Sequence, residues 1–132
     1  MADTMRFDLV SPERSLASVA AESVQIPGME GDLTAMPKHA PLITTLRPGV
    51  VRVMAEGISS EYVVSGGFAE ITPEATTILA EEALPRGEAS GEMMERLEAD
   101  ADRALEEAPE DRRLMAGQRR RDVAQLRRQL AL

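Results

Sequence analysis

His39 is the only histidine in the chain, so it is the first residue to consider for acid–base or metal chemistry. A zinc site with several histidines, or catalytic machinery that needs a second histidine, is excluded by this single imidazole. No serine or carboxylate stands beside His39 in a recognisable nucleophile motif. We therefore interpret His39 as a residue that holds its own loop or contacts another protein.

Gly28 and Gly31 have a spacing that could form a phosphate-binding loop. Such a loop needs a following helix and a Lys-Ser/Thr pair, and neither follows Gly31. We predict instead a turn with unusual backbone angles.

The sequence holds no cysteine, which excludes thiolate metal sites and disulfides. With no acid–base pair, metal cluster or nucleophile in its pattern, the chain is predicted not to be an enzyme.

Charge is distributed unevenly along the chain. Residues 1–85 hold 5 basic and 12 acidic residues, residues 86–111 hold 3 and 10, and residues 112–132 hold 7 and 1, so the net charges are −7, −7 and +6. A basic end of this kind can bind nucleic acid or an anionic membrane. We predict neither partner, because the whole chain carries −8 and has only two Phe and one Tyr for stacking. The basic residues are Arg112, Arg113, Arg119, Arg120, Arg121, Arg127 and Arg128.

The first part of the chain is predicted to form short β-strands, because apolar runs are broken by Gly and Pro about every ten residues. Met5–Leu9 alternates apolar and polar residues, as one strand with a single buried face does. Glu56-Gly57 and Pro73-Glu74 are predicted turns, and Gly66-Gly67 is predicted to be a hairpin turn. The predicted strands are 5–9, 19–26, 41–46, 50–54, 61–64, 68–71 and 76–80.

The composition changes after Leu84, where a helical pattern begins. Ser90 is placed to cap a first helix, Pro109 ends it, and a second helix is predicted over about 111–130. Two helices joined by a short turn form an antiparallel hairpin. The predicted apolar positions are Met94, Leu97, Ala101, Leu105 and Ala108 in the first helix and Leu114, Met115, Val123, Leu126 and Leu130 in the second.

These patterns together predict an α+β chain. An N-terminal antiparallel β-sandwich occupies residues 1–85, and a C-terminal antiparallel two-helix hairpin occupies residues 86–132. The acidic first helix would lie beside the basic second helix. The arginines of the second helix would then have acidic partners within the chain. Residues 1–6 do not resemble a targeting signal, and no window approaches the roughly 18 apolar residues of a membrane span. We expect a soluble protein.

Residues 28–42 contain Gly28-x-x-Gly31-Asp32 followed by Pro37-x-His39-Ala40-Pro41-Leu42. This segment resembles the epsilon family of bacterial F-type ATP synthases, whose mitochondrial counterpart is called delta. Further matches follow in the family's order and cover about residues 7–84. They are Leu46-Arg47-Pro48-Gly49, Gly66-Gly67-Phe68-Ala69-Glu70-Ile71 and Thr77-Ile78-Leu79-Ala80-Glu81.

The resemblance implies a non-catalytic rotor subunit of the central stalk, which couples proton-driven rotation of the membrane ring to the shaft. Its β-sandwich would bind the gamma shaft and rest on the ring of c subunits. Its hairpin would lie against the shaft or extend to the alpha and beta subunits of the catalytic head, where it can oppose ATP hydrolysis. The subunit would be peripheral on the cytoplasmic face of the bacterial plasma membrane, without inserting into it.

Residue roles follow from the same resemblance. Glu30, Gly31 and Asp32 would lie on the loop that faces the ring, and the alternative is that the two acids are solvated turn residues. His39 and Pro41 would contact the shaft or hold their loop. Either the basic helix pairs with the chain's own acidic stretch, or it meets the catalytic head. The arginines considered for that second role are Arg112, Arg113, Arg119 and Arg120.

Two departures from the family pattern stand out. Lys38 occupies a position where the family usually has glycine, so its loop must do without glycine's conformational freedom. Residues 99–104 only approximate the motif through which some relatives bind ATP, with Asp100 and Arg103 in place but Ala99 replacing a branched residue. We predict no ATP binding and no other cofactor. The alternative function is a freestanding small-ligand-binding β-sandwich whose helices close over a deep apolar pocket.

Overall fold

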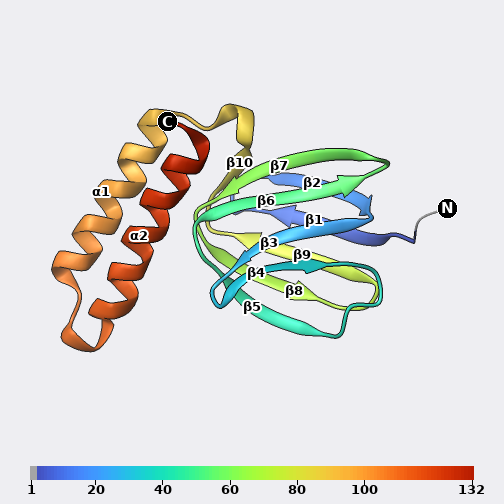
Figure 1. Ribbon diagram of the computed structural model, residues 1–132, viewed down its shortest axis with the longest axis horizontal. Helices are drawn as coiled ribbons and strands as arrows, with labels where there is room; N and C mark the ends of the chain where they lie inside the picture. The colour runs from blue at the N-terminus through green and yellow to red at the C-terminus, as the bar shows by residue number, and fades with distance from the viewer. Residues whose placement is uncertain (1–2) are drawn as a thin grey trace. The chain divides into compact units, whose positions relative to one another are not determined.

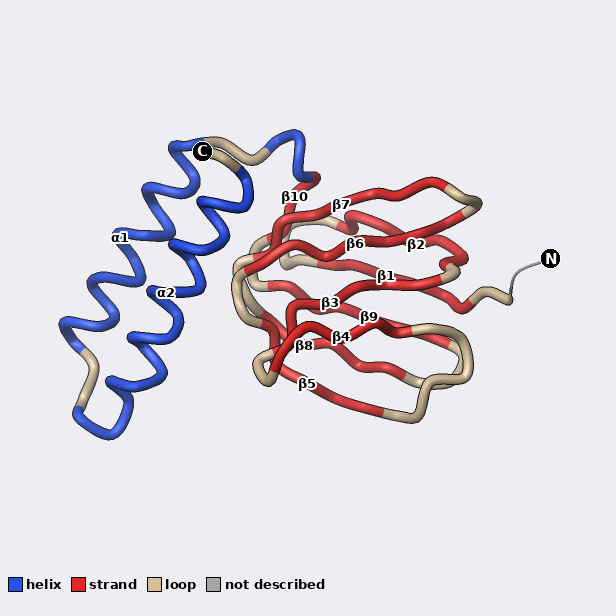
Figure 2. Tube along the Cα trace, in the orientation of Figure 1, coloured by secondary structure: helices blue, strands red, loops and turns tan. Residues whose placement is uncertain are grey.

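The computed structural model describes residues 3–132, and the chain divides into two compact units that meet between Arg86 and Gly87. Figure 2 shows that the first unit consists of strands and loops and that the two long helices belong to the second. The fold is therefore α+β, a β-sandwich followed by a helical hairpin, as the sequence predicted.

Over residues 3–86, the β unit contains ten strands in two layers (Figure 1). One layer has the order β10-β7-β6-β3 with β4 beside β3, and the other has the order β5-β8-β9-β1-β2. A single pair, Gly28 with Leu46, connects the layers between β3 and β5. The strands are β1 Met5–Val10, β2 Ser15–Ala21, β3 Ser23–Gly28, β4 Gly31–Ala35, β5 Leu42–Leu46, β6 Gly49–Ala55, β7 Ile58–Val64, β8 Gly67–Ile71, β9 Ala75–Ala80 and β10 Ala83–Pro85.

Alternation along the strands builds the core between the layers. Met5, Phe7 and Leu9 of β1 are buried, which confirms the predicted inward face of this strand. Facing strands contribute further buried aliphatic side chains, including Val24, Ile26, Val51, Val53, Ile71 and Ile78. Each fully buried side chain of this size contributes roughly 1.5–3 kcal/mol to folding. Burial between the two layers is therefore the main stabilising contribution in this unit, whose sequence has no cysteine.

Three features of the sheet differ from the prediction. The apolar stretch 19–26 is not one strand, because the chain leaves β2 at Ala21 and enters β3 at Ser23 in the other layer. Strands β4 and β10 were missed, since both are short and neither shows a long apolar run. The pairing is also not wholly antiparallel, because β1 runs parallel to β9.

Gly66-Gly67 is not the predicted hairpin turn. Strand β7 pairs with β6 and β10, whereas β8 pairs with β5 and β9, so these two glycines carry the chain from one layer to the other. Both have positive φ, 145° at Gly66 and 133° at Gly67. A Cβ on Gly67 would lie 2.8 Å from the Cα of Ala80 and still closer to the carbonyl oxygen of Leu79. The glycine pair thus permits a close approach of β8 to β9.

The second unit is an antiparallel pair of helices, α1 Gly91–Glu107 and α2 Arg113–Leu130. The predicted cap is confirmed, since the Met93 amide donates a 3.2 Å hydrogen bond to the Ser90 hydroxyl. Short 3₁₀ turns at Arg86–Glu88 and Glu110–Arg112 precede the two helices.

The buried side chains of the hairpin are fewer than predicted. Val123 and Leu126 of α2 are buried, but Leu114 is 81% exposed and Met115 is 67% exposed. Leu114 precedes Val123 by nine residues, which is two and a half turns at 3.6 residues per turn, so the two side chains lie on opposite faces of α2. It therefore points away from the seam. On α1 the buried residues are Met93, Met94, Leu97 and Ala101.

Candidate functional site

The loop with the predicted ring-facing residues is the tip of the β3–β4 hairpin. Gly28 and Gly31 form the last pair of the ladder, and Met29 and Glu30 make the two-residue turn. Gly31 has a φ of 137°, which confirms a turn with unusual backbone angles. Met29 and Glu30 are exposed at this tip, and the carboxylate of Asp32 forms an ion pair with Arg47.

His39 lies in the loop that joins β4 to β5. Its Nδ1 lies 2.6 Å from the carbonyl oxygen of Ala40, and its amide donates a 3.1 Å hydrogen bond to Met36, so the ring and backbone both support the loop. Pro41 follows it and is exposed. Lys38 adopts a left-handed conformation with a φ of 70°, an arrangement in which glycine is favoured.

The two candidate loops lie at opposite ends of the β unit. Strand β4 runs from Gly31 at the Met29–Glu30 turn to Ala35 beside Val24, so the loop that follows it begins at the far end of the layer (Figure 1). A single partner surface at one end of the sandwich cannot therefore engage both Glu30 and His39. The structure therefore separates the two candidate loops.

An exposed apolar patch covers the outer face of β5, β8 and β9, and sequence patterns did not single it out. Phe68 is 56% exposed, and it lies directly opposite Leu79, which is also 56% exposed. Ile43 on β5 is 70% exposed and lies on the same face, since Thr45 two residues later is the cross-strand partner of Phe68. We call Ile43, Phe68 and Leu79 the outer apolar patch. Contiguous exposed apolar side chains are a common feature of surfaces that bind other proteins.

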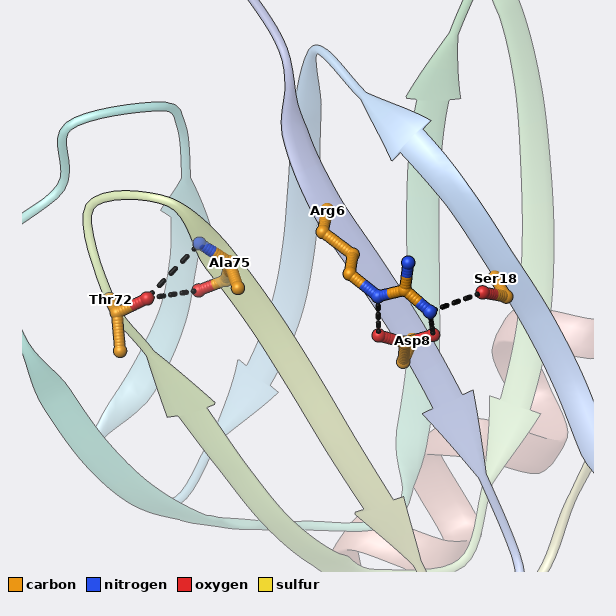
Figure 3. A network of polar contacts seen from close by, with 5 residues as sticks. All are labelled: Arg6, Asp8, Ser18, Thr72 and Ala75. Carbon is orange, nitrogen blue, oxygen red and sulfur yellow. Dashed lines mark hydrogen bonds and ion pairs between the residues drawn. The ribbon is translucent and has the colours of Figure 1, made fainter.

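A polar network occupies the outer face of β1 and β2 (Figure 3). The Arg6 guanidinium donates hydrogen bonds to Asp8, at 2.8 and 3.3 Å, and to the Ser18 hydroxyl at 3.1 Å. Hydrogen bonding with Ser18, and then with Arg6, lowers the pKa of Asp8. The same view shows Thr72 bonded to Ala75 through two hydrogen bonds, which close the β8–β9 turn.

A groove of about 660 Å³ adjoins this network, lined by residues that include Arg6, Lys38 and Glu74. It is open to solvent and rimmed by charge. This groove is not the enclosed apolar pocket that the ligand-binding alternative requires.

Arginines of α2 pair with the acidic helix, as one of the two interpretations predicted. Arg120 forms an ion pair with Asp102, and Arg127 forms one with Glu98. Arg113 adds a 3.4 Å hydrogen bond to the carbonyl oxygen of Leu105. Of the four arginines considered for contact with a catalytic head, Arg120 is thus already engaged within the hairpin.

The other three predicted contact arginines lie near the start of α2 and along it. Arg112 and Arg113 are exposed, and Arg119 is half-buried. On α1, Asp100 and Arg103 of the ATP-motif resemblance pair with each other at 2.6 Å across one turn. Their charges are therefore directed at each other.

Neither a metal centre nor a membrane span is found in the part of the chain that the structure describes. No group of three or more His, Cys, Asp or Glu side chains within residues 3–132 could hold a metal ion. No helix there is long and apolar enough to cross a membrane.

Comparisons with known proteins agree with this architecture. The family described as "ATP synthase, Delta/Epsilon chain, beta-sandwich domain" matches residues 4–86. The ATP synthase epsilon chain of Ruegeria sp. (strain TM1040) is 56% identical over 111 residues, which cover 84% of this chain and 81% of that one. The chain belongs to the ATP synthase delta/epsilon family. The epsilon chain of Rhodobacter capsulatus is 54% identical over 108 residues and covers 82% of each chain.

Solved structures share the fold of this delta/epsilon family member. A chain in the Tetrahymena thermophila mitochondrial ATP synthase central stalk and c-ring aligns with a TM-score of 0.71 at 15% identity, covering 99% of this chain and 98% of that chain. A chain of the Euglena gracilis mitochondrial ATP synthase aligns with a TM-score of 0.66 at 23% identity, covering 89% and 75%. Both support the fold.

Membership of the delta/epsilon family makes this chain a non-catalytic, epsilon-type subunit of ATP synthase. Its function therefore depends on surfaces that bind other subunits rather than on reacting groups. The ordered motifs in the sequence located two of the candidate loops. They could not indicate the outer apolar patch, because exposed and buried apolar residues of a strand look alike until the pairing of strands is known.

Proposed function

We propose that this chain docks on the gamma shaft through the outer apolar patch and meets the ring of c subunits through the tip of the β3–β4 hairpin. Torque from the ring would then pass through the rigid β-sandwich into the shaft, on the cytoplasmic face of the bacterial plasma membrane. The observation that carries the proposal is the cluster of exposed Ile43, Phe68 and Leu79 on a chain of this family.

The outer apolar patch has the chemistry of a permanent interface. Phe68 and Leu79 are cross-strand neighbours, and apolar contact area of this kind dominates the energy of stable protein interfaces. Glu70 lies on the same face opposite Ile43 and supplies a polar rim. A partner that covers the patch would remove its apolar surface from water, at about 25 cal/mol for each Å² buried.

The tip of the β3–β4 hairpin has a different chemistry. Glu30 places a carboxylate beside an exposed Met29, and Asp32 adds a second one that pairs with Arg47, so the loop suits a partner that offers basic or polar side chains. The polar loops of the ring subunit are the partner that we propose for it. His39 lies at the other end of the unit, and we propose that it and Pro41 contact the shaft there.

The helical hairpin supports a regulatory role. Val123 and Leu126 are the buried side chains among the described residues of α2. Of the flanking interhelical pairs, Arg120–Asp102 is exposed and Arg127–Glu98 is half-buried. Exposed pairs contribute only about 0.2–1 kcal/mol each. A marginally packed element can change position at small cost, so we propose that the hairpin opposes ATP hydrolysis through Arg112, Arg113 and Arg119 on the catalytic head.

Two measurements test these assignments. Phe68→Ser combined with Leu79→Ser should weaken binding to purified gamma subunit at least about tenfold, because the partners lose an apolar anchor. Ile58→Ser is the matched control, since Ile58 is 65% exposed on β7, outside the patch. Equal affinities for the double variant and the control would refute docking through the patch.

Removal of residues 87–132 should raise ATP hydrolysis by the assembled enzyme, and an unchanged rate would refute the regulatory role.

A further inference from the structure

The tip of the β3–β4 hairpin is held in place by the turn that joins β5 to β6. Strand β4 pairs only with β3 among the described strands, so the ladder alone leaves the tip supported on one side. The Met29 amide donates a 3.0 Å hydrogen bond to the Thr45 carbonyl, and the Arg47 amide donates one of 3.0 Å to the Pro27 carbonyl. The tip is therefore attached to the other layer of the sandwich by two backbone bonds.

Arg47 adds a side-chain attachment to this backbone frame. Its guanidinium pairs with the carboxylate of Asp32, immediately after the turn. The Arg47 side chain is 25% exposed, whereas that of Asp32 is 80% exposed, so the arginine approaches from the body of the protein. A guanidinium held in this way restrains the strand that leaves the turn, since the Arg47 backbone is itself anchored to Pro27 of β3.

Close packing beneath the turn leaves little room for other arrangements. A Cβ on Gly28 would lie 2.8 Å from the carbonyl oxygen of Gly31, and a Cβ on Gly49 would lie 2.7 Å from the Cβ of Pro27. The start of β6 at Gly49 therefore approaches Pro27 of β3 more closely than a side chain at residue 49 would permit, while Gly28 packs tightly within its own hairpin.

We propose that Arg47 is the positioning residue for the tip, and that Met29 and Glu30 are the groups this tip presents to its partner. Asp32 has its carboxylate neutralised by Arg47, while Glu30 has no ion pair or hydrogen bond among the described residues. The charge offered at the surface is thus that of Glu30, beside an apolar Met29 that is 41% exposed. This inference rests on the proposed function, in which the tip meets the ring.

Hydrogen exchange of the free chain tests the positioning role without any partner. Arg47→Gln should accelerate exchange of the Met29 amide about two- to fivefold, the change expected for loss of a partly exposed ion pair worth about 0.5–1 kcal/mol. Arg52→Gln is the control, because Arg52 on β6 pairs at 3.9 Å with Glu61 on β7, not with a residue of the tip, and should leave this amide unchanged. The exchanged pair Arg47→Asp with Asp32→Arg should restore the slow rate.

Equal exchange in Arg47→Gln and the parent, or no restoration by the exchanged pair, would overturn the positioning role.

Crosslinking of the assembled enzyme tests the tip as a contact. The chain has no cysteine, so Glu30→Cys labelled with a photoactivatable maleimide gives a unique probe. It should crosslink to the ring subunit, with a yield that falls several-fold when Arg47→Gln is added. Absence of any ring crosslink would refute the proposed ring contact, and a yield unaffected by Arg47→Gln would refute the dependence on Arg47.

Discussion

Gly67→Ala is expected to be among the most damaging single substitutions in the β unit. The residue has a φ of 133°, a region that side chains other than glycine rarely adopt. The new methyl group would lie 2.8 Å from the Cα of Ala80 and closer still to the carbonyl oxygen of Leu79. Because both neighbours are backbone atoms of β9, no side-chain rotation relieves the overlap. Strand β8 must move away from β9 at the pair Gly67–Ala80.

The magnitude follows from two separate costs. The backbone conformation costs about 1–3 kcal/mol for alanine, and overpacking against a fixed backbone costs about 1–3 kcal/mol more. The sum is about 4 kcal/mol, a large share of the roughly 5–15 kcal/mol that stabilises a typical domain. Gly57→Ala carries a left-handed backbone cost without overpacking, because Gly57 has a φ of 74° and nothing lies within 4 Å of a Cβ there. It should lose only about 1–2 kcal/mol.

Urea unfolding followed by tyrosine fluorescence measures this difference. Tyr62 is the only tyrosine, the chain has no tryptophan, and Tyr62 packs against the core of the β unit. Its signal therefore reports on this unit in the full chain. Gly67→Ala should lower the unfolding midpoint well below that of Gly57→Ala. If the two variants have the same free energy of unfolding, the close approach of β8 to β9 contributes nothing and the reasoning is wrong.

Two further predictions concern the other end of the unit. Lys38→Gly should stabilise the unit by about 0.5–1 kcal/mol, as measured by urea unfolding. The left-handed conformation at a φ of 70° costs lysine more than glycine adds to the entropy of the unfolded chain. A loss of stability would contradict this. Asp8→Asn should destabilise the protein near pH 7 by less than about 1 kcal/mol. Because the folded-state pKa of Asp8 is lowered, its contribution is full above its unfolded-state pKa of about 3.9 and disappears as the pH falls through the folded-state value. The gap between parent and Asp8→Asn should therefore close in acid, and a gap that persists at pH 2 would disprove the linkage.

Much of the fold could be predicted from local patterns. Alternation in Met5–Leu9 identified a strand and its buried face, and the Ser90 cap identified the start of α1. Both signals depend on residues close together in sequence. Gly66-Gly67 shows where local patterns fail, since a glycine pair between two apolar runs fits a hairpin turn and a crossing between layers equally well. The pairing of β8 with β5 and β9 decides between them.

The candidate surfaces were only partly predictable for the same reason. Glu30 and Asp32 could be assigned to one loop, but their different environments depend on Arg47, which is 15 residues from Asp32 in sequence. The outer apolar patch combines residues from three strands, and their exposure depends on which face of each strand points inward. Leu114 was expected in the hairpin seam but is 81% exposed, because its helical phase differs from that of Val123 by half a turn.

Purification of the chain from its source cell tests the central assignment most directly. The full-length protein would carry an affinity tag and be isolated from membranes solubilised in mild detergent, with the Phe68→Ser, Leu79→Ser variant handled in parallel. We predict that the parent elutes with a multisubunit complex that hydrolyses ATP and contains gamma and ring subunits, and that the variant recovers much less of it. Recovery of the parent chain alone, with no ATP-hydrolysing complex, would contradict its role as a rotor-stalk subunit.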